Sequence, residues 1–331
     1  MVLITGSTGL VGSYLAIHLL ENNEIVRAIY RNLNAIEKTK SVFELQKKID
    51  LFDKIEWIQA DINDISALEI AFRNIDFVYH CAALISFDPK DEEKLRKTNI
   101  EGTANIVNFC ILKSIKKLCY VSSIATLGDL LPNETIITEE TNWNPEKLHS
   151  DYAISKYGAE IEVFRGQQEG LNVVIVNPGI VLGAGFWNSG SGEIFTKVKN
   201  GLKFYTSGST GFVSVTDLVK VMFLLMKSEI QGERFIVISE NIYYKNLLQT
   251  IATEFGVKNP SIQVSKFVTN LASRLDWILS NVFQQKRKIS KSMSQSLHAK
   301  DFYSNEKIQK KLNFNFEKIS VSIKTIIETQ I

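Results

Sequence analysis

The chain has few cysteines, almost no net charge and no long apolar run. Each of these features excludes some classes of protein. Its three cysteines, Cys81, Cys110 and Cys119, are an odd number without metal-ligand spacing, so we expect reduced, buried thiols in a cytosolic protein. The four histidines are scattered, and no metal site is predicted. The 38 basic and 36 acidic residues nearly cancel, which gives no indication of a nucleic-acid partner.

The sequence contains no run of about 18 apolar residues, so no membrane-spanning helix is expected. An apolar strand pattern begins at residue 2 and leaves no room for a signal peptide. Both observations favour a cytoplasmic location. A hydrophobic share of 45% over 331 residues is enough for a large core, arranged as one large domain or two unequal ones.

A glycine motif follows the first apolar run. Gly6, Gly9 and Gly12 stand in G-x-x-G-x-x-G spacing between a predicted strand and a predicted helix. The first glycine permits a tight turn, the second lets the backbone approach a pyrophosphate, and the third lets the helix pack closely. Amides at the start of the helix would point at the phosphates. The motif predicts a dinucleotide site; a glycine-rich turn in an unrelated fold is the alternative.

The end of the second predicted strand (residues 24–30) concerns the choice of cofactor. Sites for NAD usually carry an acidic residue here for the ribose 2′-hydroxyl. This chain has Tyr30-Arg31-Asn32 instead, and the planar guanidinium of Arg31 is suited to a 2′-phosphate. NADP is therefore the preferred cofactor. NAD stays open, because Arg31 could also stack on the adenine or face water.

Predicted strands and helices alternate up to Pro178, which is typical of a doubly wound parallel Rossmann sheet of the α/β class. Further strands are predicted at 55–59, 76–80, 117–122 and 172–177, with helices at 35–49, 65–73, 92–112 and 152–168. Clustered glycines after Pro178 indicate shorter elements, followed by a strand at 234–239 and helices at 243–255 and 267–283. We expect a dinucleotide-binding domain at 1–178 and a smaller α/β substrate-binding domain at 179–331, interleaved in space.

The helical stretch 267–283 leads into a basic cluster at 284–288. We expect an amphipathic helix that packs its apolar side on the core, followed by a solvated basic loop. Docking on a membrane surface is the alternative.

Three residues carry the predicted chemistry. Tyr152 and Lys156 are four apart and share one helix face, and Ser123 ends an apolar strand. A free tyrosine has a pKa of about 10; a nearby ammonium and an oxidised nicotinamide would lower it towards the working range. Lys156 could also hold the ribose hydroxyls, and Ser123 could orient a substrate oxygen. The alternative is a tyrosine packed in the core with Lys156 in water.

The chain resembles the extended short-chain dehydrogenase/reductase family, also called the NAD-dependent epimerase/dehydratase family. The resemblance rests on the glycine motif and on segments at 61–62, 80–83, 99–103, 122–128, 152–156, 178–183, 212–217 and 303–314. It implies that Tyr152 is the acid/base, Lys156 its activator and Ser123 the polarising group. Asn99 is often a structural or water-holding residue in this family, and dimers often form through the helices at 92–112 and 152–168.

The glycine motif and the resemblance together predict a cofactor site. Its residues are Gly6, Ser7, Thr8, Gly9, Leu10, Val11, Gly12, Arg31, Asp61, Ile62, Cys81, Ala82, Ala83, Asn99, Tyr152, Lys156, Pro178 and Val181.

Departures from the family pattern narrow the range of reactions that the resemblance implies. Ile124 and Ala125 stand where dehydratases carry an Asp-Glu pair, which disfavours a dehydratase. Gly179 replaces a common asparagine and Thr210 a common arginine, so a nucleotide-sugar site is weakly supported. The chain resembles the dihydroflavonol-reductase-like branch and predicts NADPH-dependent reduction of an aldehyde or ketone. A nucleotide-sugar epimerase with tightly bound NAD is the alternative. A cofactor-sensing protein without activity is disfavoured, because a sensor has no need of the three catalytic groups.

Overall fold

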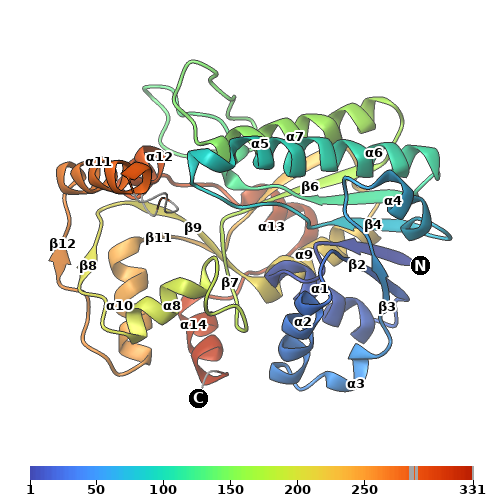
Figure 1. Cartoon of the computed structure of the whole chain (residues 1–331), viewed down its shortest axis with the longest axis horizontal. Helices are drawn as coiled ribbons and strands as arrows, with labels where there is room; N and C mark the ends of the chain where they lie inside the picture. Colours follow the sequence, from blue (N-terminus) through green and yellow to red (C-terminus); the bar gives the residue numbers. More distant parts are fainter. Residues whose placement is uncertain (283–286, 288–289, 330–331) are drawn as a thin grey trace.

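The computed structural model describes residues 1–282, 287 and 290–329 and is built on a seven-stranded sheet (Figure 1). All strand pairs in this sheet are parallel, in the order β10-β6-β5-β4-β1-β2-β3. The strands are β1 (Val2–Thr5), β2 (Val26–Tyr30), β3 (Glu56–Gln59), β4 (Phe77–His80), β5 (Lys117–Val121), β6 (Val173–Pro178) and β10 (Glu233–Val237). The predicted fold class, a doubly wound α/β sheet, is confirmed.

Helices cover both faces of this sheet (Figure 1). Side chains alternate along each strand, so Val2 and Ile4 enter one core while Leu3 enters the other. The first core is covered by α1 (Leu10–Glu21), α2 (Asn34–Leu45) and α9 (Val215–Lys227), and the second by α4 (Ile65–Ala71), α6 (Gly102–Leu112) and α7 (Asp151–Gln168). Burial on both faces explains why the strands read as continuous apolar runs.

The strand order reverses between β1 and β4. The chain runs from β1 outward through β2 and β3, then returns to place β4 on the other side of β1. In open α/β sheets a crevice forms at such a reversal, outside the carboxyl ends of the strands. The turn after β1 and the segment after β4 therefore face the same crevice.

The second half of the chain builds a smaller unit and also returns to the main sheet. Its strands β7 (Ile180–Leu182), β9 (Ser209–Ser214) and β11 (Glu240–Tyr243) form one sheet, and β8 (Phe204–Tyr205) pairs with β12 (Ile262–Gln263). Its helices are α8 (Gly192–Lys199), α10 (Tyr244–Glu254), α11 (Lys266–Val282), α12 (Lys291–Ser296), α13 (Glu306–Leu312) and α14 (Ile319–Glu328). β10 completes the main sheet, and Ile308 of α13 packs into its first core.

Two predicted helices are not single α-helices in the structure. The helix expected over 35–49 ends at Leu45 because Lys47 takes a left-handed backbone conformation (φ 55°), and a short helix α3 (Ile49–Phe52) follows. The helix expected over 92–112 consists of α5 (Glu92–Leu95), a π-helical turn η2 (Arg96–Glu101) and α6. Hydrophobic periodicity does not reveal a π turn, which adds one residue to a helical turn.

The packing predicted for the stretch 267–283 is wrong. Helix α11 forms, but Phe267, Leu271, Leu275 and Leu279 are exposed to solvent. Phe283 and most of the basic cluster at 284–288 lie outside the described residues. Within the part of the chain that the structure describes, no helix is both long and apolar enough to cross a bilayer.

Candidate active site

The glycine turn after β1 has the geometry of a phosphate cradle. Gly6 has a φ of +68°, and a Cβ added to it would lie 2.5 Å from the backbone nitrogen of Ala82. A Cβ at Gly12 would lie 2.3 Å from the carbonyl oxygen of Gly6, so the helix could not pack on the turn. At Gly9 the nearest atom would be 3.4 Å away. Two of the glycines therefore permit backbone contacts, and the third leaves an open face for a ligand.

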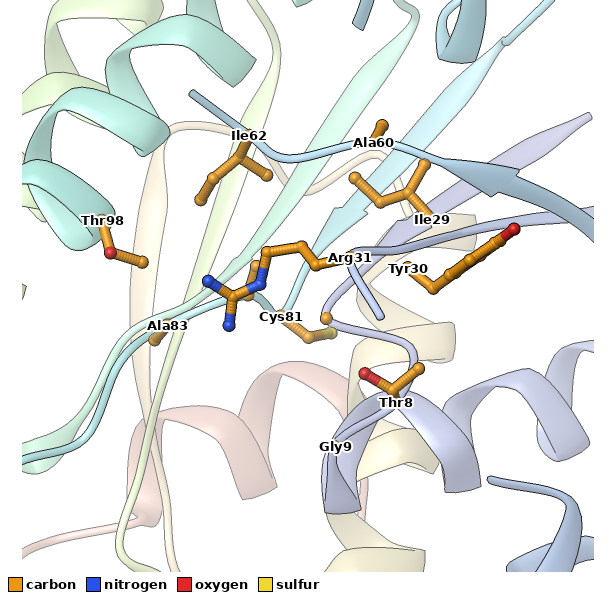
Figure 2. Close-up of a pocket in the computed structure, with 12 residues that line it drawn as sticks. Thr8, Gly9, Ile29, Tyr30, Arg31, Ala60, Ile62, Cys81, Ala83 and Thr98 are labelled. Atoms are coloured by element: carbon orange, nitrogen blue, oxygen red, sulfur yellow. The ribbon is translucent and has the colours of Figure 1, made fainter. Parts of the chain in front are cut away.

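A cavity of about 250 Å³ opens beside this turn (Figure 2). Of the predicted cofactor residues it is lined by Gly6, Thr8, Gly9, Arg31, Ile62, Cys81, Ala82 and Ala83. Four further residues line the cavity and were not predicted from the sequence: Ile29, Tyr30, Ala60 and Thr98. Three of these lie at the ends of β2 and β3, a position that could have indicated them; Thr98 lies in the π turn. The lining fits a dinucleotide, with small or apolar residues beside the open backbone of the turn.

The remaining predicted cofactor residues do not line this cavity. Ser7 is fully buried and its hydroxyl donates a hydrogen bond to the carbonyl of Ile29, which attaches the turn to β2. The others are Leu10, Val11, Gly12, Asp61, Asn99, Tyr152, Lys156, Pro178 and Val181. A Cβ at Gly183 would lie 2.8 Å from a methyl group of Leu10, so the segment after β7 packs against the start of α1.

Arg31 lies at the open side of the cavity. Its side chain is 67% exposed, and its guanidinium lies 3.8 Å from the carboxylate of Asp61. Figure 2 shows this side chain directed across the cavity from the end of β2. An exposed ion pair of this length is weak, so the guanidinium is available to an anionic ligand.

His80 holds the end of β4 in place. Its imidazole nitrogens lie 2.6 Å from the Thr5 hydroxyl and 2.9 Å from the Thr103 hydroxyl. Complete burial lowers the pKa of His80 to about 3, so the ring is neutral. The Thr5 hydroxyl also accepts a hydrogen bond from the amide of Ala82. This network fixes the backbone of the segment that lines the cavity.

Asn99 joins the same segment to helix α7. Its side-chain oxygen accepts from the amide of Leu84 (2.7 Å), and its nitrogen donates to the Leu84 carbonyl (3.0 Å) and to the Ser155 hydroxyl (2.9 Å). Both amide hydrogens are therefore used within the protein. The structure places Asn99 as a buried link between elements, and its contact with the cofactor stays a prediction.

Ser123 and Tyr152 lie together at the carboxyl end of β5. Helix α7 begins at Asp151 with Ser150 as its N-cap, whose hydroxyl accepts from the amide of Ala153 at 3.1 Å. Tyr152 therefore stands in the first turn of the helix. Its phenol lies close enough to the Ser123 hydroxyl for that hydroxyl to act on the pKa of the tyrosine. A hydroxyl pair of this kind can bind a carbonyl or alcohol oxygen.

Lys156 is buried one helical turn further on, with 1% of its surface exposed. Its Nζ donates hydrogen bonds to the Tyr120 hydroxyl (2.6 Å) and to the carbonyl of Val121 (2.8 Å). Burial lowers the pKa of Lys156 to about 7, against the opposing effect of the negative charge on Glu160. The alternative of a lysine in water is thus excluded by the structure.

The expectation of a lowered pKa for Tyr152 is wrong for the protein alone. Burial raises the pKa of Tyr152, and the nearby Ser123 hydroxyl opposes this only in part. The ammonium that was expected to lower it donates its hydrogen bonds to Tyr120 and Val121 instead. The tyrosine consequently keeps its proton near neutral pH.

The reversed strand order, the glycine cradle and the buried lysine beside two hydroxyls define a Rossmann-type protein of the nicotinamide-dependent class. A family model described as the NAD dependent epimerase/dehydratase family matches residues 2–238. The chain belongs to this family, as its motifs predict.

Curated relatives and solved structures agree with this assignment. A Synechocystis protein that carries the name of a dihydroflavonol 4-reductase is 29% identical over 266 residues, covering 78% of this chain and 73% of its own. Anthocyanidin reductase of Arabidopsis thaliana is 28% identical over 260 residues, covering 72% and 75%. The structure of the yeast methylglyoxal/isovaleraldehyde reductase Gre2, complexed with NADPH, superposes with a TM-score of 0.76 at 20% identity, covering 99% of this chain and 97% of that one. The prediction of an NAD(P)-dependent oxidoreductase is confirmed by these relatives.

Proposed function

We propose that the protein is an NADPH-dependent reductase of an aldehyde or ketone. The observation that carries the proposal is the placement of Tyr152 beside Ser123, in the turn of α7 that precedes the buried Lys156. The relatives named as reductases support the same reaction.

In this proposal each group has one task. When bound, the reduced nicotinamide supplies the hydride. The Ser123 hydroxyl donates a hydrogen bond to the substrate oxygen and orients it. Tyr152, which keeps its proton because burial raises its pKa, donates that proton to the oxygen. Lys156, held by Tyr120 and Val121, supplies positive charge near the reacting centre.

The first test is oxidation of NADPH and NADH, followed by absorbance, with a panel of aldehydes, ketones and flavonoid-like or steroid-like carbonyls. We expect cofactor oxidation that depends on the carbonyl substrate. The variant Tyr152→Phe should lower its rate at least about a hundredfold, since general acid catalysis contributes roughly 10² to 10⁴ in rate. Cofactor binding by this variant, measured by fluorescence, should be unchanged.

Tyr157 offers a matched control, because it lies on the same helix and stacks on Trp143 rather than contacting Ser123. Tyr157→Phe should keep full activity. Unchanged turnover in Tyr152→Phe would refute its role as acid. Interconversion of nucleotide sugars without net cofactor oxidation would support the epimerase alternative instead.

The choice of NADP rests on Arg31, which we propose binds the 2′-phosphate. Replacement by alanine removes a charge-assisted hydrogen bond. We expect Arg31→Ala to raise the KM for NADPH about tenfold, equivalent to ~1.4 kcal/mol, and to leave the KM for NADH unchanged. Arg96, which is 60% exposed on another element, provides the control substitution Arg96→Ala. An equal loss for both cofactors would assign Arg31 to the adenine and refute its role in cofactor choice.

A further inference from the structure

Helix α11 attaches to the protein through its polar side. Thr269 and Ser273 are buried, with 8% and 5% of their surfaces exposed. The Thr269 hydroxyl accepts a hydrogen bond from Ser294 of α12 (2.8 Å) and lies 3.0 Å from the imidazole of His298. Ser294 also donates to Asn270 (2.9 Å). Polar side chains, which on most amphipathic helices face water, therefore hold this helix against the rest of the protein.

The apolar side of α11 faces solvent. Phe267 is 77% exposed, Leu271 47%, Leu275 53% and Leu279 54%. These residues follow one another at intervals of four and form one stripe along the helix. Trp277, 55% exposed, lies on the same helix. Figure 1 shows α11 at the outer edge of the molecule beside α12. An apolar stripe of this kind on a protein surface indicates an interaction site.

The charge around the stripe indicates the kind of partner. Residues 266–291 contain six basic residues and one acidic residue, whereas the whole chain has a net charge of only +2. Lys266, Arg274 and Lys291 are exposed, and the acidic residue, Asp276, lies 3.7 Å from the guanidinium of Arg287. Two copies of the chain that met through α11 would bring like charges together. The segment is complementary to a partner that has an anionic surface over an apolar interior.

We propose that α11 docks the protein on the surface of an anionic lipid bilayer. The helix lies in the interface, with Phe267, Leu271, Leu275 and Leu279 among the acyl chains. The exposed side chains of Lys266, Arg274 and Lys291 lie among the headgroups. The attachment is peripheral, because the polar side of the helix remains bonded to α12.

The position of α11 relates this surface to the candidate active site. The amide of Arg287, just beyond the helix, donates a hydrogen bond to the carboxylate of Asp88 (3.1 Å). The neighbouring Phe87 is 45% exposed, and its ring centroid lies 5.9 Å from that of Tyr152. Docking would therefore bring the loop beside Tyr152 close to the bilayer.

The test is flotation of the full chain with vesicles of phosphatidylcholine, alone or mixed with phosphatidylserine. We expect the protein to float with the mixed vesicles, less so in high salt. The variant Leu271→Ser/Leu275→Ser should reduce the bound fraction at least about tenfold, since it removes two apolar side chains that would enter the acyl chains. Neither leucine belongs to a described hydrophobic core, so the substitutions leave the cores intact.

Ile70 and Val321, each 47% exposed on α4 and α14, form the matched control, and Ile70→Ser/Val321→Ser should float like the wild type. Absence of flotation, equal flotation with phosphatidylcholine alone, or unchanged flotation of the α11 variant would overturn the proposal. A wild-type dimer that the α11 substitutions convert to a monomer, without vesicle binding, would make this face an interface between copies. None of these readouts depends on enzymatic activity.

Discussion

Lys156 combines complete burial with a titration close to neutral pH. Burial lowers its pKa from 10.5 to about 7 in the folded protein. The unfolded chain therefore binds one more proton than the folded chain between about pH 7 and pH 10.5. Stability rises with pH wherever the unfolded state binds more protons, so this group penalises folding below pH 7 and the penalty disappears towards pH 10.5.

The variant Lys156→Met should lack this dependence. We expect the free energy of unfolding of the wild type to gain up to a few kcal/mol relative to the variant between pH 7 and pH 10, since one pKa unit is worth ~1.4 kcal/mol. Urea unfolding of both proteins without cofactor, at several pH values across this window, measures the difference. Parallel curves for the two proteins would contradict a depressed lysine pKa.

At the scale of secondary-structure elements, helix α7 positions several side chains of the candidate site. Tyr152, Lys156 and Glu160 stand at intervals of four on one face of it. Glu160 is buried and accepts hydrogen bonds from Ser122 (2.6 Å), Thr126 (2.8 Å), Asn177 (2.9 Å) and Arg234 (3.0 Å). These donors come from the end of β5, the turn after it, β6 and β10. The helix is thus fastened to the turn that carries Ser123.

Substitution of Glu160 should therefore loosen several elements at once. Glu160→Gln leaves the guanidinium of Arg234, 20% exposed, without its charge partner. We expect a loss of about 3 kcal/mol in unfolding free energy, because breaking a buried ion pair costs roughly 3–5 kcal/mol. The pKa of Lys156 should fall further, since the charge of Glu160 raises it.

Glu193 provides the control for this measurement. It pairs with Lys197 on an exposed helix face, at 2.9 Å, and Glu193→Gln should cost less than about 0.5 kcal/mol. Chemical denaturation of the two variants under identical conditions gives the comparison. Equal losses would show that the network around Glu160 does not brace the site.

At the scale of the whole molecule, the two halves of the chain share one sheet and one core. β10 belongs to the later half but completes the main sheet, and Ile308 of α13 packs into the same core as residues of α1. If the later half unfolded alone, β6 would lose its neighbour β10, and the part of the first core that contacts Ile308 would be exposed to water. We propose that the regions 1–178 and 179–331 are structural divisions of one cooperative unit.

Two tryptophans allow this to be tested. Trp57 packs against the first core of the main sheet, and Trp187 packs against the core of the smaller unit. Variants that retain only Trp57 or only Trp187 of the chain's four tryptophans should unfold in urea with the same midpoint by fluorescence. Distinct midpoints would show that the two regions unfold independently.

Much of the fold could be predicted because its signals are local. Apolar runs, turn glycines and helix periods depend on neighbouring residues, so the sheet strands were placed to within one or two residues of their observed ends. The glycine turn was predicted for the same reason. The π turn that carries Thr98 and Asn99 was not predicted, since hydrophobic periodicity does not distinguish it from an α-helical turn.

The tertiary structure decided the protonation of Tyr152 and Lys156, their hydrogen-bond partners and the side of α11 that faces solvent. The sequence placed Tyr152 and Lys156 on one helix face, but only the fold shows the lysine ammonium bonded to Tyr120 and Val121 and the tyrosine pKa raised by burial. The pattern of α11 likewise determined an amphipathic helix without determining which side faces the protein. Sequence alone thus determined the elements, their order and the residue types at the site, because these follow from local chemistry. The charge of each group and the exposed side of α11 depend on distant atoms, which come together only when the chain folds.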